Sequence, residues 1–329
     1  MSPSTSHDPR VTLFIPTWNA GREFPDILRL MREQELDRPF EIVAIDSGST
    51  DGTLELLEQE PVRLLQIPNR EFNHGLTRNR GIQEARGEIV VLATQDARPF
   101  DQHWMQRMVD AFDDPEVAGA YSRQIPRPDA NPFIRDRLGG WAAAQEDRCV
   151  QQVAGPDEFA RLAPLERYAR VAFDNVSSSV RRAVALEFPF RSRKFGEDID
   201  WAHRVILAGH KIVFEPRSAV VHSHNNSIWY EFKRIYLDHQ NLHRTLGVHT
   251  VPRWRDLYSC TLHAWAHLFK VIAQDDRLGP PAKVWWWIKS IPYGLSQNLA
   301  QFLGARSVKK IQDSNRWYVC IDRLLRRGV

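Results

Sequence analysis

The sequence has few of the features that mark secreted, disulfide-stabilised or membrane-spanning proteins. Its three cysteines, Cys149, Cys260 and Cys320, are too far apart for a zinc site or a disulfide framework. We expect buried or inert thiols in a reducing cytoplasm. No run of about 18 or more apolar residues occurs, so we expect no membrane-spanning helix. The first ten residues, MSPSTSHDPR, lack the apolar core of a signal peptide, which favours a cytoplasmic location.

Two further absences narrow the class of protein. A dehydrogenase or nucleotidyltransferase on a parallel sheet should carry a glycine-rich phosphate loop, G-x-G-x-x-G, after its first strand. The corresponding segment here is IPTWNAG (Ile15–Gly21), which does not match. Internal repeats and low-complexity segments are also missing, which excludes solenoid and fibrous classes.

Acidic residues become scarce towards the C-terminus. Residues 280–329 contain nine Lys or Arg and two Asp or Glu, a balance of +7, although the whole chain carries only +3. Residues 1–279 therefore carry −4. A basic tail on a mildly acidic body indicates an anionic partner for the tail, such as lipid headgroups or nucleic acid.

The first 125 residues alternate apolar runs with helix-like segments, which predicts a parallel sheet covered by helices on both faces. The predicted strands are Val11–Pro16, Glu41–Asp46, Val62–Pro68 and Glu88–Thr94. The predicted helices are Phe24–Glu35, a second with Asp51 or Thr50 as N-cap, and a third closed by Gly87. Ligands of such sheets bind beyond the carboxyl ends of the strands, where Thr17, Asp46 and Asp96 are expected.

The second half of the chain is predicted to finish the sheet and then become helical. Residues 173–184 indicate a polar loop followed by a strand or short helix. A helix then starts at FGEDID and closes at Gly209, and KIVFEP and AVVHSH are expected to form two short strands. From Ser227 onward the pattern is helical and rich in tryptophan. We therefore predict a tail at residues 1–10 that is disordered, an α/β domain at 11–226 and a helical domain at 227–329.

Four groups of polar residues are candidates for chemistry, and each has a simpler interpretation. Asp46 in DSGSTDGT could accept a hydrogen bond from a nucleobase, although Gly, Ser and Asp also dominate ordinary turns. Asp96 could hold a divalent cation that binds phosphate, or could be a turn former. Glu197, Asp198 and Asp200 could supply a general base, or could only complement a helix dipole. His222 and His224 share one strand face and suit metal or phosphate binding, or they are ordinary surface histidines.

Five motifs in this order resemble an inverting family 2 glycosyltransferase with the GT-A fold. They are IPTWNAG, IDSGSTDGT, LTRNRGIQEARGEIVVLATQDARP, FGEDID and VVHSHNNS, and the resemblance covers roughly residues 11–227. EFNHGLTRN, TQDA and HSHNNS are similar to bacterial rhamnosyltransferases that build O-antigens and related surface polysaccharides. The family usually has Asp-x-Asp at this strand end. Here Asp96 matches the second Asp and Thr94 replaces the first.

The resemblance implies a role for each matching residue. Pro16, Thr17, Asn19 and Asp46 would bind the nucleotide. Arg78, Asn79 and Gln95 would bind the donor. Asn175 would face the acceptor, Asp198 would be the general base and Glu197 would lie beside it. Asp96, His222 and His224 would hold Mg²⁺ or Mn²⁺ with the donor's diphosphate.

The function implied is transfer of L-rhamnose from dTDP-β-L-rhamnose to a glycan, or a polyprenyl-diphosphate-linked glycan, with inversion. A UDP-sugar donor and a non-catalytic nucleotide-binding scaffold are the alternatives. No nucleic acid partner is expected, and a homo-oligomer is an open option. The aromatic and basic C-terminal helices are expected either to lie on the inner face of the plasma membrane or to pack against the catalytic domain or a second subunit.

Overall fold

The computed structural model describes residues 10–140 and 142–328, and these form two compact units. The first unit contains residues up to 127, 140–162 and 169–222, and the second contains 128–139, 163–168 and 223 onward. Helix α7 (Pro164–Val171) is divided between them. The tail predicted at residues 1–10 lies, apart from residue 10, outside the described residues.

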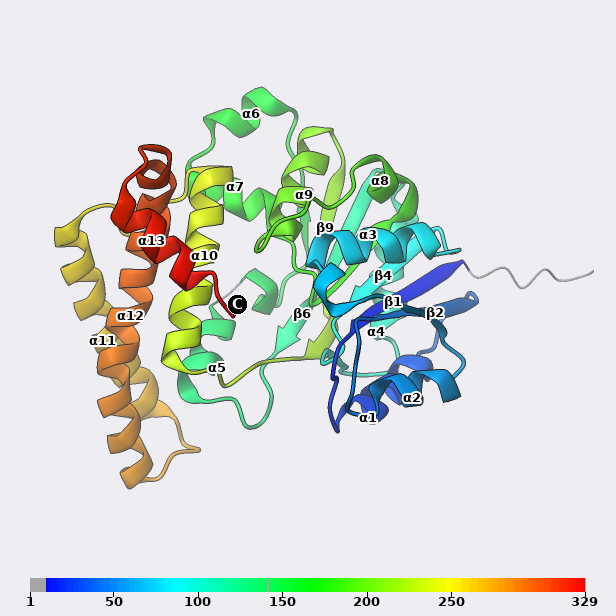
Figure 1. The fold of residues 1–329 in the computed structure, drawn as a ribbon, viewed down its shortest axis with the longest axis horizontal. Helices are drawn as coiled ribbons and strands as arrows, with labels where there is room; N and C mark the ends of the chain where they lie inside the picture. Colours follow the sequence, from blue (N-terminus) through cyan, green and yellow to red (C-terminus); the bar gives the residue numbers. More distant parts are fainter. Residues whose placement is uncertain (1–9, 141, 329) are drawn as a thin grey trace, which may run out of the picture. The chain divides into compact units, whose positions relative to one another are not determined.

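The first unit is built on one mixed sheet in the order β3-β2-β1-β4-β8-β6-β9-β5, with β7 paired to β9 (Figure 1). The strands are β1 Val11–Thr17, β2 Phe40–Asp46, β3 Arg63–Gln66, β4 Ile89–Ala93, β5 Arg98–Pro99, β6 Val117–Ile125, β7 Cys149–Gln151, β8 Ser177–Arg181 and β9 Lys211–Val221. The helices are α1 Phe24–Arg32, α2 Thr53–Gln59, α3 His74–Glu84, α4 Trp104–Val109, α6 Pro156–Arg161, α8 Arg182–Glu187 and α9 Glu197–Leu207, with short 3-10 turns at Asn69–Glu71, Asp110–Asp113 and Ala142–Ala144.

The predicted α/β class and the four N-terminal strands are confirmed. Strands β3, β2, β1 and β4 run parallel, as their continuous apolar sequences predict. Beyond β4 the sheet is mixed, because β8 is antiparallel to both β4 and β6, while β9 is parallel to β6. The carboxyl ends of β1, β2 and β4 therefore meet at one edge.

Helices cover both faces of the parallel part of the sheet. Alternate side chains of β1, such as Leu13 and Ile15, join a core with α1 and α4. Phe14 points to the opposite face, where α3 approaches so closely that a Cβ on Gly81 would lie 2.3 Å from the Phe14 ring. Figure 1 shows α1 and α2 on one side of these strands and α3 on the other. The period of two in the strand decides which helix each residue meets.

Three local predictions are wrong. Helix α3 ends at Glu84, so Gly87 does not close it; Gly87 instead lies against β1, where a Cβ would be 2.6 Å from the Thr12 nitrogen. The N-cap of α2 is Gly52, in the left-handed region at φ 95°, not Asp51 or Thr50. A left-handed residue at this position is easiest for glycine because it has no Cβ.

The third error concerns β9, which was predicted as two strands. The segments KIVFEP and AVV form one strand, which ends at Val221 before His222 and His224, and its register against β6 shifts between Ser122 and Arg123. Glu215 pairs with Ser122 and Ala219 pairs with Arg123, so the intervening residues bulge out of the ladder. Pro216 lies in this bulge, where a missing N–H costs no ladder hydrogen bond.

The second unit is helical, as the sequence from Ser227 onward predicts. Its helices are α5 Pro132–Gly139, α10 Ile228–Leu246, α11 Trp254–Gln274, α12 Pro280–Gln312 and α13 Arg316–Leu325. Phe133 stacks on Tyr293 at 4.2 Å and meets Trp286 edge-on at 5.2 Å, which forms a small core. Across residues 10–140 and 142–328, no helix combines the length and hydropathy needed to cross a bilayer.

Of the expectation that the cysteines are buried or inert thiols, burial is wrong and inertness stays a prediction. Cys149 and Cys320 are exposed and Cys260 is half-buried, and all three are free thiols. Cys149 sits on the short strand β7, whose first two residues are exposed. A three-residue strand buries little of its own surface, so the apolar character of cysteine does not decide its position there.

Candidate active site

Asp46 ends β2 and holds the loop that follows it. Its Oδ1 accepts hydrogen bonds from the backbone nitrogens of Gly48 and Ser49, both at 2.9 Å. Its Oδ2 accepts from the hydroxyls of Thr17, at 2.9 Å, and Ser49. The buried carboxylate is thus already surrounded by four donors from the protein. Its predicted contact with a nucleobase stays a prediction.

The loops after β1 and β2 are fastened to each other by side chain to backbone hydrogen bonds. Pro16 pairs with Ile45 within the sheet. Asn19 adopts a left-handed conformation at φ 43°, and its side-chain oxygen accepts from the Thr50 nitrogen at 2.8 Å. The Asn19 nitrogen donates to the Ser49 hydroxyl at 2.8 Å. A strained backbone at a strand end is typical of a ligand-binding loop, although it does not name the ligand.

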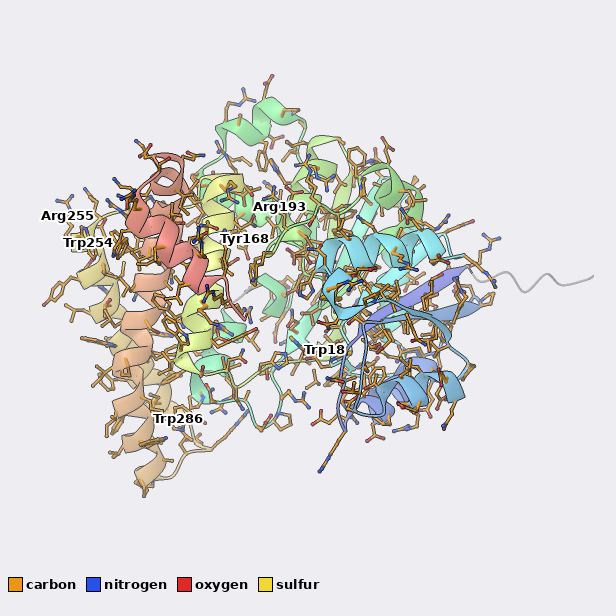
Figure 2. All side chains as sticks on the ribbon, viewed as in Figure 1. Trp18, Tyr168, Arg193, Trp254, Arg255 and Trp286 are labelled. Atoms are coloured by element: carbon orange, nitrogen blue, oxygen red, sulfur yellow. The ribbon has the colours of Figure 1, made fainter. Side chains whose placement is uncertain are left out.

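Gln95 connects the ends of β1 and β4. Its Oε1 accepts from the Trp18 nitrogen at 2.8 Å and its Nε2 donates to the Trp18 oxygen at 3.1 Å. Trp18 leaves half of its side chain exposed, and Figure 2 labels it. The predicted nucleotide-binding residues from these two strands therefore share one edge of the sheet.

Asp96 and His222 come together from the ends of β4 and β9. Their Oδ2 and Nε2 atoms are 3.5 Å apart. The other ring nitrogen of His222, Nδ1, is 3.0 Å from Oε1 of Gln124. Because a glutamine oxygen only accepts, this contact requires a proton on Nδ1, and in the neutral ring the lone pair is then on Nε2, the nitrogen that faces Asp96. Metal-binding histidines are oriented in this way.

His224 follows two residues after His222 and belongs to the second unit, so its predicted part in the metal site stays a prediction. Within the described part of the chain, the hydroxyl of Thr94 is buried without a hydrogen-bond partner. The carboxylate of Asp96, the imidazole of His222 and this hydroxyl suit a divalent cation. The residues present therefore fit the metal that the sequence predicted.

Arg78, Glu197 and Asn175 form a buried ion pair with an amide beside it. The Arg78 guanidinium is 3.0 Å from Glu197 Oε1, which also accepts from Asn175 Nδ2 at 3.4 Å. Arg78 further donates to the carbonyls of His74 and Asn175 at 3.0 and 3.3 Å. Burial, with the Arg78 charge nearby, lowers the pKa of His74. The predicted donor role of Arg78 and acceptor role of Asn175 stay predictions.

Asp198 lies next to this pair in the first turn of α9 and is half-buried. Loss of hydration, followed by the negative charges of Glu197 and Asp174, raises the pKa of Asp198 well above its usual range. One hydrogen bond to its Oδ1, from the Ile199 nitrogen at 2.8 Å, acts in the opposite direction. A carboxylate of raised basicity that still reaches solvent is suited to accept a proton.

Asn79 and Asp200 serve the structure around α9. The Asn79 amide both donates to and accepts from the backbone of Phe190, at 2.7 and 2.8 Å. Asp200 is buried and pairs with Arg193 and Arg204. Of the three acids in FGEDID, two are thus held by arginines, and Asp198 is left as the candidate base.

Gln124 and Asp174 are the residues that sequence reasoning missed. Gln124 Nε2 donates to Asp174, and Asp174 also accepts from the Val176 nitrogen at 2.9 Å. A chain of contacts therefore runs from Asp96 through His222 and Gln124 to Asp174, whose charge acts on Asp198. Asp174 stands in the segment FDNVSSSV, so its polar setting was visible; Gln124 sits on a central strand, where nothing in the sequence marks it.

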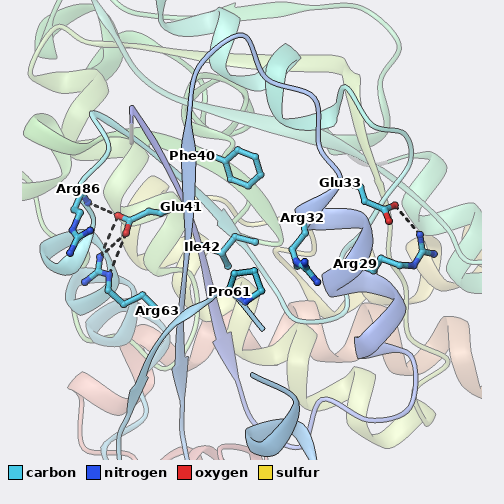
Figure 3. A pocket seen from close by; sticks show the side chains of 9 residues that line it. All are labelled: Arg29, Arg32, Glu33, Phe40, Glu41, Ile42, Pro61, Arg63 and Arg86. Atoms are coloured by element: carbon cyan, nitrogen blue, oxygen red, sulfur yellow. Dashed lines mark hydrogen bonds and ion pairs between the residues drawn. The ribbon is translucent and has the colours of Figure 1, made fainter. Parts of the chain in front are cut away.

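A pocket on another part of the first unit does not belong to this site. It is lined by Arg29, Arg32, Glu33, Phe40, Glu41, Ile42, Pro61, Arg63 and Arg86 (Figure 3). Phe40 and Arg63 begin β2 and β3, so the pocket lies at the amino ends of strands whose carboxyl ends carry the site. Its charges pair internally, as with Arg63 and Glu41 at 3.3 Å.

The polar edge at the carboxyl ends of the parallel strands, the acids at the start of α9 and the candidate metal group indicate an enzyme site at this edge of the mixed sheet. The profile of the family described as glycosyl transferase family 2 matches residues 12–160. The chain belongs to this family of glycosyltransferases.

Two similar proteins come from Salmonella. The chain is 30% identical over 230 residues to the O-antigen chain rhamnosyltransferase WbaN of Salmonella anatum, covering 69% of this chain and 70% of that protein. It is 29% identical over 238 residues to the O-antigen chain rhamnosyltransferase RfbN of Salmonella typhimurium, with the same coverage.

The fold is shared with a solved structure, that of S. aureus TarS residues 1–349 in complex with UDP. The TM-score is 0.51 at 15% identity, over 93% of this chain and 92% of that one. The GT-A fold expected from the motifs is thereby confirmed.

Proposed function

We propose that the protein transfers L-rhamnose from dTDP-β-L-rhamnose to a hydroxyl of a lipid-linked or oligosaccharide acceptor, with inversion at the anomeric carbon, in the synthesis of a bacterial surface polysaccharide. The names of the two Salmonella relatives support the sugar. The observation that carries the chemistry is Asp198, the acid of FGEDID whose pKa is raised while its neighbour Glu197 is held by Arg78.

Asp198 is the general base in this proposal. It takes the proton of the acceptor hydroxyl while that oxygen attacks the anomeric carbon from the face opposite the nucleotide. A single displacement breaks the bond from the sugar to the diphosphate, so a β-linked donor gives an α-linked product. Arg78 contributes by fixing Glu197, whose negative charge keeps Asp198 basic.

The nucleotide would bind at the carboxyl edge of β1, β2 and β4. Pro16, Thr17, Asn19 and Asp46 would line its pocket, and Gln95 would hold Trp18 in place beside it. Asn79 would act near the sugar through the Phe190 loop that it fixes, and Asn175 would act near the acceptor.

Asp96, His222 and His224 would hold Mg²⁺ or Mn²⁺, and the bound cation would neutralise charge on the leaving diphosphate. Gln124 fixes the His222 ring with Nε2 towards Asp96, so the protein would be ready for the ion before it binds. Thr94 puts a neutral hydroxyl where the family usually has an aspartate, so the site carries one negative charge fewer.

A screen of nucleotide sugars tests the proposal, with released nucleoside diphosphate as the readout and a lipid-linked glycan acceptor present. We expect dTDP-β-L-rhamnose to be the best donor, with activity suppressed by EDTA and restored by Mg²⁺ or Mn²⁺. Diphosphate release from UDP-glucose without release from dTDP-rhamnose would move the proposal to a UDP-sugar. If no donor releases its diphosphate, the result would favour the alternative that the protein is a non-catalytic nucleotide-binding scaffold.

A further inference from the structure

Helices α11 and α12 run antiparallel and contact each other along one side of each helix, which we call the inner side. The indole nitrogens of Trp265 and Trp287 donate to the carbonyls of Ile291 and Phe269, at 2.9 and 3.2 Å. At the start of α11, Trp254 lies at the border between the inner and outer sides, because its ring is 4.3 Å from that of Phe302 while 63% of its surface is exposed. These contacts leave the outer side of each helix without a described partner in residues 10–140 and 142–328.

Large apolar side chains occupy these outer sides at helical spacing. On α11 they are Trp254, Tyr258, Leu262 and Phe269, and on α12 they are Val284, Trp285, Ile288, Ile291 and Leu295. Each exposes between 39% and 71% of its surface. On α12 the row from Val284 to Leu295 extends about 17 Å along the helix axis. Exposed apolar side chains that gather along a helix in this way are typical of an interaction site. We call these nine residues the apolar face.

Basic residues predominate around the apolar face, although Asp275 and Asp276 follow α11 in the connection to α12. Helix α12 contains no Asp or Glu in 33 residues, and α11 contains only Asp256, which caps its own helix through Arg253. Basic residues accompany the apolar ones on both helices: Arg255, Lys270, Lys283 and Lys289. The Lys289 ammonium lies 4.7 Å from the ring centre of Trp285 and 5.4 Å from that of Trp286. Figure 2 shows Arg255 beside Trp254 on α11.

The charge and the aromatic content of the apolar face favour one kind of binding partner over another. A second copy that used the same face would bring the basic residues of two chains together, which is unfavourable. An anionic lipid surface offers the opposite charge and also accepts Trp and Tyr at headgroup level. Lysine and arginine can keep their charge in the headgroups while their stems lie along apolar surface, as Lys289 does over its two indoles.

We propose that the apolar face is a docking surface for an anionic phospholipid bilayer, on which α11 and α12 lie in the plane of the interface without crossing it. Each Lys or Arg adds roughly a factor of five to partitioning near such a surface. The inference concerns this face alone and does not depend on which sugar the first unit transfers.

Sedimentation of the full chain with vesicles tests the proposal. The test compares vesicles of phosphatidylcholine with about a third phosphatidylglycerol against vesicles of phosphatidylcholine alone. Each kind of vesicle is tested at low and at high salt. The protein should sediment with the anionic vesicles at low salt, and its tryptophan emission should shift to shorter wavelength. High salt or neutral vesicles should reduce the bound fraction, because electrostatic attraction is screened or absent.

The variant Trp285→Ser with Ile288→Ser should bind anionic vesicles at least tenfold more weakly. Trp317→Ser on α13 is the matched control, because Trp317 is exposed to 56% and Trp285 to 54%, and it should bind like the parent. Circular dichroism checks that each variant is folded.

Two results would overturn the proposal. The first is equal recovery in the supernatant with and without anionic vesicles. The second is a lipid-free dimer in analytical ultracentrifugation that Trp285→Ser with Ile288→Ser dissociates, because the occupant would then be a second copy.

Discussion

The substitutions Glu197→Gln and Asp198→Asn each replace a carboxylate by an amide, and we expect the first to lower stability and the second to lower activity. Glu197 and Arg78 are both buried and 3.0 Å apart. Removing one member of a buried pair leaves the other charge uncompensated, which costs about 3–5 kcal/mol. Glutamine can still accept hydrogen bonds from Arg78 and Asn175, so we expect Glu197→Gln to lie near the lower value, about 3 kcal/mol. For a domain of this size that lowers the melting temperature by about 6–12 °C.

Asp198→Asn should do the reverse. The pKa of Asp198 is raised in the folded protein, so folding is disfavoured by its ionised form. The stability contributed by this group is complete below its unfolded pKa and is lost as the pH rises through its folded pKa. The neutral amide removes this loss. Asp198→Asn should therefore be at least as stable as the parent at neutral pH, with the difference vanishing in acid, while transfer falls by about 10²–10⁴.

Urea unfolding followed by circular dichroism measures stability, and release of nucleoside diphosphate measures transfer. The test is the pair of results together. Glu197→Gln should be less stable than the parent protein, and Asp198→Asn should be as stable as the parent but inactive. A fully active Asp198→Asn beside a stable but inactive Glu197→Gln would refute the reasoning and move the base by one residue.

Three further changes test other parts of the site and fold. Asp174→Asn removes a negative charge that raises the pKa of Asp198, so the acid limb of the pH–rate profile should move to lower pH; an unmoved limb would mean that Asp198 does not control it. Gln124→Leu leaves His222 Nδ1 without its acceptor and should weaken Mn²⁺ binding by about 10–100-fold in titration calorimetry, whereas unchanged binding would remove Gln124 from the site. Gly87→Ala should cost about 1–3 kcal/mol in urea unfolding, because its Cβ would press on the backbone of β1; a neutral result would contradict the close approach.

The local pattern of the chain determined the sheet and the order of its parts. A continuous apolar run such as Ile89–Ala93 is buried on both faces, which requires helices above and below the sheet, so the strand and the polar edge beyond it could be predicted. The position of Asp96 beyond a strand end follows from the apolar run before it, which is a property of neighbouring residues that the sequence displays directly. The expectation that His222 and His224 share one face of a strand is wrong, because β9 ends at Val221 and both histidines lie beyond it.

Tertiary structure decided which of the candidate residues form ion pairs and hydrogen bonds within the protein and which are left as candidates for catalysis. Glu197 and Asp198 are adjacent in the sequence and chemically alike, yet Arg78, far away in the chain, pairs with one and leaves the other with a raised pKa. Gln124 meets His222 through the pairing of β6 with β9, and Gly87 is required by the distance to β1 rather than by a helix end. Such contacts join residues that are about 75–120 positions apart in the chain. They depend on how strands and helices pack, and the sequence pattern around each residue carries no record of them.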